Sequence, residues 1–171
     1  MKTCVYLIGF MGVGKTTVAK ELSGRLRLPL VDTDEAIVER EGRSIPEIFE
    51  REGEKIFREK ETRMLRDLSE SGAKIVSCGG GIAMREENRD IMAAHGVTVL
   101  LKASPETILE RVKGDDNRPL LAGKKNVTAI AAMMEERRPA YEAAANLQIP
   151  VDGRTPAEIA EEIADRISSE R

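Results

Sequence analysis

The segment that constrains this chain most is the octapeptide GFMGVGKT, which runs from Gly9 to Thr16. It matches the pattern G-x-x-x-x-G-K-[ST], and it lies between the apolar run Cys4–Ile8 and a segment of helical periodicity. A strand, a glycine-rich turn and a helix in this order are the context in which the pattern forms a phosphate-binding loop. The motif therefore predicts a P-loop, with a turn that binds no ligand as the alternative.

A P-loop predicts a site for a nucleoside triphosphate and Mg²⁺, because its backbone N–H groups and the following helix N-terminus favour phosphate. Lys15 can bridge the β- and γ-phosphates, and the hydroxyl of Thr16 can ligate Mg²⁺. The expected nucleotide contacts in the loop are Gly12, Val13, Gly14, Lys15, Thr16 and Thr17. The sequence has neither the Asn-Lys-x-Asp motif of GTPases nor the LSGGQ signature of transport ATPases. A small chain with an exposed, lid-like loop favours a small-molecule kinase, because a closed lid excludes water that would hydrolyse ATP.

Short apolar runs alternate with longer helical segments along the whole chain, and this alternation predicts an α/β fold with a parallel sheet. The expected strands are Cys4–Ile8, Leu30–Asp32, Lys74–Cys78, Val97–Leu101 and Leu147–Val151. The expected helices span residues 15–26, 34–41, 44–52, 54–70, 86–95, 105–113, 126–145 and 155–168, and Pro139 is expected to interrupt the helix at 126–145. A length of 171 residues predicts a single domain, and residues 114–125 read as an exposed, mobile loop.

The composition favours small anionic ligands over nucleic acid. The 27 cationic residues comprise 17 Arg and 10 Lys, yet the formal net charge is -3. Guanidinium groups bind carboxylates and phosphates through two parallel hydrogen bonds, whereas an acidic chain does not favour a nucleic-acid backbone. No apolar run approaches the ~20 residues of a membrane helix. Two cysteines form no disulfide framework, so we expect a reduced, cytoplasmic setting.

Acidic side chains follow the second expected strand. In a doubly wound sheet, ligands bind outside the carboxyl ends of the strands, where Asp32 and Asp34 would lie. Asp32 could hold Mg²⁺ through water, and Asp34 could accept a hydrogen bond from an attacking hydroxyl group. The alternative is that Asp34 caps the helix that follows.

Three further features each have a functional and a structural interpretation. Arg58 and Glu61 are spaced to pair on one helix face, either to orient the guanidinium or as an ordinary solvated pair. The triple glycine 79–81 would border a ligand or form a tight turn. Arg118 could reach a transferring phosphoryl group or remain a solvated loop charge.

Taken together, these motifs closely resemble the shikimate kinases over nearly the whole chain. The resemblance rests on GxxGxGKTT at 9–17, DxD at 32–34, SIxEIF…GExxFRxxE at 44–61, GGG at 79–81, NR at 88–89, RPLL at 118–121 and ERxPxY at 136–141. It implies a three-layer αβα P-loop kinase fold with a five-stranded parallel sheet. It also implies a lid at about 114–125 and a helical region at about 33–61 that binds shikimate.

The resemblance further implies ATP-dependent phosphorylation of the shikimate 3-hydroxyl group, in the chorismate pathway to aromatic amino acids. Asp34, Arg58, Gly80, Gly81 and Arg137 would contact shikimate, with the two arginines on its carboxylate. Lys15 and Arg118 would stabilise the γ-phosphoryl group, with Asp34 as the third catalytic residue. Thr16 and Asp32 would hold Mg²⁺, and Arg111 and Arg154 would lie near the adenine.

Other functions remain open at this stage. A related kinase of another polyol acid, such as gluconate, would carry the same phosphate loop. An ATP-binding module without transfer chemistry is a second alternative, although the expected catalytic residues are all present. Cys78 departs from the family pattern before the triple glycine, and it is either a buried thiol or open to alkylation. No long exposed apolar stripe calls for a partner, which favours a monomer.

Overall fold

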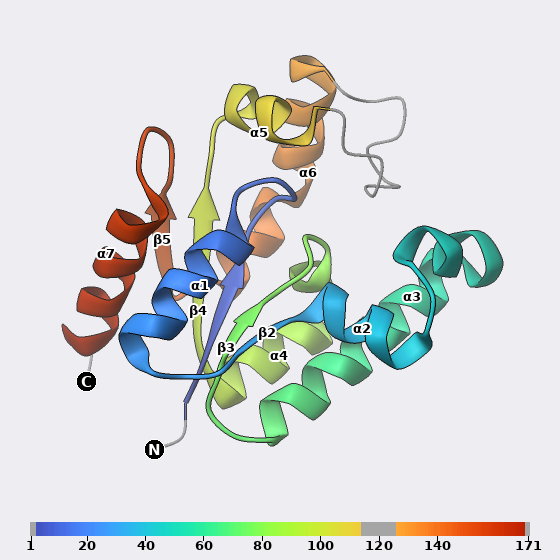
Figure 1. Ribbon diagram of the computed structural model, residues 1–171. Helices are drawn as coiled ribbons and strands as arrows, with labels where there is room; N and C mark the ends of the chain where they lie inside the picture. The colour runs from blue at the N-terminus through green and yellow to red at the C-terminus, as the bar shows by residue number, and fades with distance from the viewer. Residues whose placement is uncertain (1–2, 114–125, 170–171) are drawn as a thin grey trace.

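The fold is built on a five-stranded sheet, and all its paired strands run parallel, as predicted. A computed structural model describes residues 3–113 and 126–169 of the chain (Figure 1). The strands are β1 (Cys4–Ile8), β2 (Leu30–Asp32), β3 (Ile75–Ser77), β4 (Gly96–Lys102) and β5 (Leu147–Pro150), in the order β2-β3-β1-β4-β5. The expected loop at 114–125, with Arg118, lies outside the described residues.

Helices connect the strands and cover both faces of the sheet (Figure 1). They are α1 (Lys15–Leu26), α2 (Thr33–Glu41), α3 (Ile45–Glu70), α4 (Glu86–His95), α5 (Pro105–Val112), α6 (Val127–Ala144) and α7 (Pro156–Ser169), with a 3₁₀ turn, η1 (Ile82–Met84), before α4. None of the helices in the described part of the chain is long and apolar enough to cross a membrane.

Alternate side chains of β1 enter two different cores, which makes the fold three-layered. Val5 and Leu7 pack into the larger core, with apolar side chains of α1 and α7. Cys4, Tyr6 and Ile8 point to the opposite face, into a core shared with α3 and α4. Because successive side chains of a strand point to opposite faces, a strand covered on both sides must be apolar throughout.

Three details of these elements bear on what the sequence predicts. β2 is half-buried along its length, because it is an edge strand with a neighbour on one side. The helices expected at 44–52 and 54–70 are confirmed as two helical segments, because α3 is broken between them at Gly53, whose φ of 86° is not helical. Pro139 was expected to interrupt its helix, but α6 runs through it. Pro139 and Glu135 are exposed, so water can satisfy the carbonyl group that loses its N–H partner.

The position of β1 determines where a ligand can bind. β3 and β2 lie on one side of this strand, and β4 and β5 lie on the other, so the chain reverses its direction of winding at β1. In open α/β sheets the crevice for a ligand forms at such a switch point, beyond the carboxyl ends of the strands. The loop from Gly9 to Gly14 leaves β1 at this point (Figure 1).

Candidate active site

The P-loop leads into a helix whose first backbone N–H groups have no side-chain cap. Gly12 and Gly14 adopt positive φ angles of 84° and 99°, and Gly14 is the N-cap of α1. No side chain caps this end, and the first turn of α1 contains no acidic residue. The exposed amide dipoles of such a helix end favour an anion. The local geometry is therefore suited to phosphate.

Two cationic side chains lie against this loop. Lys15 is 9% exposed, and its Nζ donates hydrogen bonds to the carbonyl oxygens of Gly9 (2.8 Å) and Phe10 (3.2 Å). Arg111, from the last turn of α5, donates to the carbonyl oxygen of Val13 (2.5 Å). One cationic side chain, Lys15, therefore belongs to the P-loop motif itself, and the other, Arg111, comes from a helix about a hundred residues later in the chain.

Thr16 and Asp32 form a hydroxyl–carboxylate pair beside the loop. The Thr16 hydroxyl donates to Asp32 Oδ2 at 3.0 Å, while Asp32 Oδ1 accepts from the backbone N–H of Glu35. Asp32 is therefore the N-cap of α2, and the alternative in which Asp34 caps this helix is wrong. Hydroxyl and carboxylate oxygens are ligands that suit Mg²⁺, which uses few protein ligands and retains waters. Among the described residues, no group of three or more His, Cys, Asp or Glu side chains could hold a metal ion.

A polar cavity of about 240 Å³ joins these elements to the loop after β3. Its lining consists of Gly12, Gly14, Lys15, Thr16, Thr17, Asp32, Asp34, Ser77, Cys78, Gly79 and Gly80. A more apolar cavity of about 310 Å³ lies behind the loop, between α5, α6 and the end of β4. We place the chemistry in the smaller one, because ionisable side chains and backbone amides converge there.

Gly79 allows two carboxylates to approach the backbone. A Cβ atom at this position would lie 2.7 Å from Asp34 Oδ1 and 3.0 Å from Glu61 Oε2, closer than side chains tolerate. The N–H of Gly79 donates to the hydroxyl of Thr33 (2.8 Å), which fastens the loop to the start of α2. A side chain at Gly79 would therefore displace these two carboxylates. The whole triplet 79–81 was expected to border a ligand or form a turn, with Gly80 and Gly81 as the substrate contacts.

Arg58 and Glu61 form a buried ion pair. The distance from Arg58 Nη1 to Glu61 Oε1 is 2.6 Å, and the two side chains are 16% and 1% exposed. The solvated-pair interpretation is therefore wrong. Desolvation is the main cause that raises the pKa of Glu61 to about 7, and the charge of Asp34 adds to it, while Arg58 and Arg137 act in the opposite direction.

The buried carboxyl of Glu61 makes the stability of the protein depend on pH. Its pKa is raised from 4.5 to about 7, so the folded state holds a proton that the unfolded state releases between these values. The stability of the wild type relative to Glu61→Gln should therefore fall as pH rises through this window, by about 1.4 kcal/mol per unit and about 3 kcal/mol in total. Urea unfolding at half-unit pH intervals measures this difference.

The matched control for that experiment is Glu54→Gln. This substitution also removes a carboxylate beside Arg58, at 3.6 Å, but from a side chain that is 54% exposed. The control should retain the wild-type slope, because Glu61 is still present. A constant difference between wild type and Glu61→Gln from pH 4.5 to 7 would contradict the assignment.

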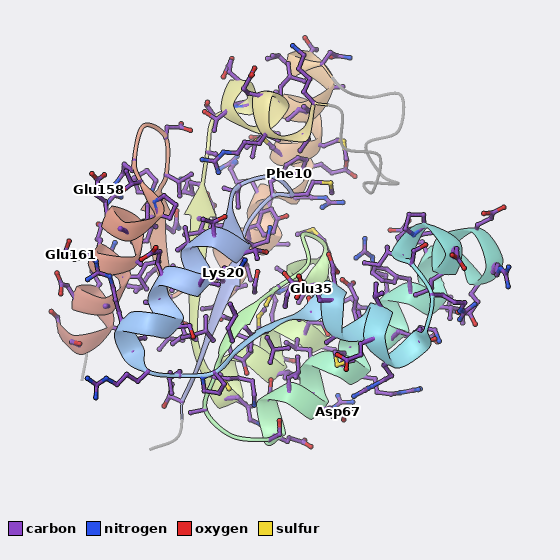
Figure 2. The ribbon with its side chains drawn as sticks, in the orientation of Figure 1. Phe10, Lys20, Glu35, Asp67, Glu158 and Glu161 are labelled. Carbon is purple, nitrogen blue, oxygen red and sulfur yellow. The ribbon has the colours of Figure 1, made fainter. Side chains whose placement is uncertain are left out.

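Arg137 holds a donor with no partner. Its Nη1 is buried and makes no hydrogen bond within the described residues. The guanidinium lies 5.6 Å from the ring centroid of Phe10, where the P-loop meets α6 (Figure 2), and beside Gly80. Buried guanidinium donors almost always have an acceptor, so an unpartnered one indicates a place for an anionic ligand.

The structure does not bring every predicted residue to this cavity. Arg154 pairs with Glu162 on α7 (2.7 Å) and donates to the carbonyl oxygen of Pro150 (2.9 Å). It borders a surface hollow that Glu158 and Glu161 also line, on the outer side of α7 (Figure 2). Cys78 does reach the polar cavity, but its thiol is 1% exposed and burial raises its pKa, which favours the unreactive form.

Sequence reasoning assigned no role to Thr33, Arg85 or Tyr141. Tyr141 lies in the ERxPxY segment, and Thr33 lies between the two acids of the DxD segment, so both had a weak local signal. Arg85 had none. Each of these three residues forms a hydrogen bond with a residue at least 23 positions away along the chain. Spacing within the sequence does not reveal such contacts.

The fold and the site define a class of protein. The site combines a P-loop at the switch point of a parallel sheet, a hydroxyl–carboxylate pair, and two arginines beside the neighbouring glycine loop. These are the parts of a P-loop small-molecule kinase.

Comparisons with known proteins give the family. The shikimate kinase family pattern matches residues 11–168. The chain is 40% identical to the shikimate kinase of Enterococcus faecalis, over 95% of this chain and 97% of that protein. It is 46% identical to that of Geobacter sulfurreducens, over 94% of this chain and 88% of that one.

Solved structures of shikimate kinases support the same family assignment. Shikimate kinase from Acinetobacter baumannii, in complex with shikimate, superposes with a TM-score of 0.96 at 33% identity, covering 100% of this chain and 96% of that one. Shikimate kinase from Aquifex aeolicus gives a TM-score of 0.85 at 40% identity, covering 98% of each chain. This chain belongs to the shikimate kinase family, and it is an ATP-dependent phosphotransferase.

Proposed function

We propose that this protein transfers the γ-phosphoryl group of ATP to the 3-hydroxyl group of shikimate, giving 3-phosphoshikimate and ADP for aromatic amino acid synthesis. The observation that carries this proposal is the buried, unpartnered donor of Arg137, which lies beside the same glycine loop as the Arg58 guanidinium. Two guanidinium groups at one loop match the carboxylate of a small acid. The family membership supports the same substrate.

The nucleotide would lie along the P-loop and the start of α1. Backbone amides from Gly12 to Thr17 would surround the phosphates, with Lys15 across the β- and γ-phosphates and Arg111 beside the loop. Thr16 and Asp32 would hold Mg²⁺, which neutralises charge on the phosphate oxygens when bound. The 3.0 Å hydroxyl–carboxylate contact between these two side chains supports this role. We also assign Arg118 to the γ-phosphoryl group and Arg154 to the adenine side, as the family resemblance implies.

The acceptor would lie between α2, α3, α6 and the glycine loop. Arg58 and Arg137 would bind its carboxylate, and the backbone at Gly80 and Gly81 would border its ring. Asp34 would accept the proton of the 3-hydroxyl group while the oxygen of that hydroxyl forms a bond to the γ-phosphorus of ATP. The bond between the γ-phosphorus and the oxygen that bridges it to the β-phosphate breaks in the same step. Holding both substrates in line would supply much of the rate enhancement.

An assay of ADP release with and without shikimate tests the proposal directly. Turnover should depend on shikimate and should be far weaker with gluconate, which would instead accelerate a kinase of that polyol acid. ADP release that is unaffected by shikimate would contradict the proposal. ATP binding by calorimetry without product formation would identify a binding module that lacks transfer chemistry.

Arg58→Ala and Arg137→Ala should each weaken shikimate binding and spare ATP. Losing one charge-assisted pair in an enclosed pocket costs about 1.5–3 kcal/mol, which corresponds to about a tenfold to hundredfold rise in the shikimate KM. The control is Arg138→Ala, because Arg138 follows Arg137 in sequence but is exposed and pairs with Glu135. An unchanged shikimate KM in both variants would contradict the carboxylate clamp.

We also propose that residues 1–171 form one P-loop kinase domain that works as a monomer in the cytoplasm. A single sheet that uses strands from Cys4 to Pro150 supports the single domain. Large exposed apolar side chains in the described residues are limited to Val38, Ile56 and Val127, on three different helices, which supports the monomer. Light scattering at assay concentration tests the oligomeric state.

A further inference from the structure

Arg85, the residue that follows η1, is hydrogen-bonded to α3, the helix that carries Arg58. Arg85 Nη1 donates to the carbonyl oxygen of Arg58 (3.2 Å) and to the hydroxyl of Thr62 (3.0 Å). The Thr62 hydroxyl in turn donates to the same carbonyl oxygen (3.1 Å). Two donors therefore hold the backbone of Arg58 itself, at the point where its side chain leaves α3. Glu61 orients the guanidinium, whereas Arg85 holds the backbone to which it is attached.

The helix that carries Arg137 has a comparable contact with the glycine loop. The hydroxyl of Tyr141 donates to the carbonyl oxygen of Gly80 at 2.5 Å. Tyr141 lies four residues after Arg137 in α6, so both side chains project from one face of this helix. Burial raises the pKa of Tyr141, which keeps its hydroxyl protonated as a donor. This bond sets the distance between α6 and the loop.

Side chains of α4 donate hydrogen bonds to the backbone of η1, which lies between these two contacts. Asn88 Nδ2 donates to the carbonyl oxygen of Ile82 (2.9 Å), and Arg89 Nη1 donates to that of Ala83 (2.8 Å). Gly81 lies against the Arg58 guanidinium, whose Cζ would be 2.6 Å from a Cβ atom at that position. Residues 80–85 thus form a braced segment that the two arginine-bearing helices meet from different sides.

We propose that Arg85 and Tyr141 are positioning residues that set the spacing of the carboxylate clamp, one for Arg58 and one for Arg137. The inference rests on the proposed function, because it assumes that these two arginines bind the acceptor's carboxylate. Bidentate recognition requires correct placement within about half an ångström, so losing a brace loosens the clamp without removing its charge. Neither residue touches the substrate; each acts through its arginine.

The test compares Arg85→Met and Tyr141→Phe with the wild type in steady-state kinetics. Each variant should raise the shikimate KM about fivefold to tenfold, the effect of losing the hydrogen bonds, two in Arg85→Met and one in Tyr141→Phe, that position a charged group. The kcat and the ATP KM should remain within about twofold. Arg85→Lys, which retains one cationic donor, should recover part of the loss.

Two control variants remove similar bonds elsewhere. Arg66→Met breaks an ion pair with Glu87 that also joins α3 to α4, at 2.7 Å, but on the exposed surface. Tyr6→Phe removes a buried hydroxyl from the same core that Tyr141 enters, but this hydroxyl is bonded to Ser69, near the end of α3, at 2.6 Å. Both controls should leave the shikimate KM unchanged. Equal KM effects in the controls would reduce Arg85 and Tyr141 to general structural roles and overturn the inference.

Two further measurements show whether the residues act through the clamp. In an Arg58→Ala background, Arg85→Met should cause no further rise in KM, and the same should hold for Tyr141→Phe in Arg137→Ala. With the methyl ester of shikimate, which lacks the anionic carboxylate, variant and wild type should differ by less than about twofold. Undiminished effects in either measurement would overturn the inference.

The outcomes also separate this inference from the function on which it rests. If Arg58→Ala and Arg137→Ala raise the shikimate KM while Arg85→Met and Tyr141→Phe do not, the bracing role alone is overturned. If none of the four variants alters the shikimate KM, the clamp and its bracing are both overturned.

Discussion

Lys15→Ala is expected to lower kcat by about a thousandfold or more. The side chain is 9% exposed and already held inside the P-loop by the carbonyl oxygens of Gly9 and Phe10. A preorganised donor in such a site is worth about 10²–10³ in kcat, and Lys15 contributes a full charge where the transferring phosphoryl group becomes more negative. The measurement is kcat at saturating ATP and shikimate.

The control for this prediction is Lys20→Ala. Lys20 lies on the exposed side of α1, five residues after Lys15 (Figure 2), and its loss should change kcat less than about twofold. Because Lys15 also ties the loop together, melting temperature and shikimate binding should be measured for both variants. A folded Lys15→Ala variant with kcat within tenfold of the wild type would refute the catalytic role.

Asp34→Asn should lower kcat by about 10²–10⁴, the usual contribution of a positioned general base. Asparagine has nearly the shape of aspartate and still accepts a hydrogen bond, but it cannot take a proton at neutral pH. Gly79 leaves space for the carboxylate, since a Cβ atom there would lie 2.7 Å from Asp34 Oδ1. The substitution should therefore affect the chemical step more than the fold. Single-turnover kinetics measure that step apart from product release.

The matched control is Glu35→Gln, at the next position in α2. Glu35 is exposed (Figure 2), and it contributes its backbone N–H to the Asp32 cap, which the substitution preserves. Its kcat should be that of the wild type. A single-turnover rate for Asp34→Asn within a factor of ten of the wild type would show that another group takes the proton.

The fold was largely predictable from the sequence because its main signals are local. All five strands were predicted within one residue of their ends, since a strand covered by helices is a short apolar run between polar turns. Errors occurred where tertiary context overrode a local rule. Pro139 did not end its helix, because that face of α6 is exposed.

The candidate site was predictable in its parts but not in its electrostatics. Arg58 and Glu61 were a recognisable helical pair, yet their spacing is the same for a solvated pair and for the buried one observed. Burial depends on which segments cover the pair. The charges that tune the pKa of Glu61 include Asp34 and Arg137, which lie 27 positions before it and 76 after it in the chain.

The amino-acid sequence by itself determined the phosphate loop, the alternation of strands and helices, and the residue types at the ends of the strands. These depend on backbone conformation and on side-chain spacing within a few residues. Only the tertiary structure decided that Glu61 is buried, that Arg137 holds an unpartnered donor, and that Arg85 and Tyr141 donate to the carbonyl oxygens of Arg58 and Gly80. The physical reason is that desolvation and hydrogen-bond partnership are properties of packed surroundings, which distant segments supply: Arg85 and Arg58 are 27 positions apart, and Tyr141 and Gly80 are 61 apart.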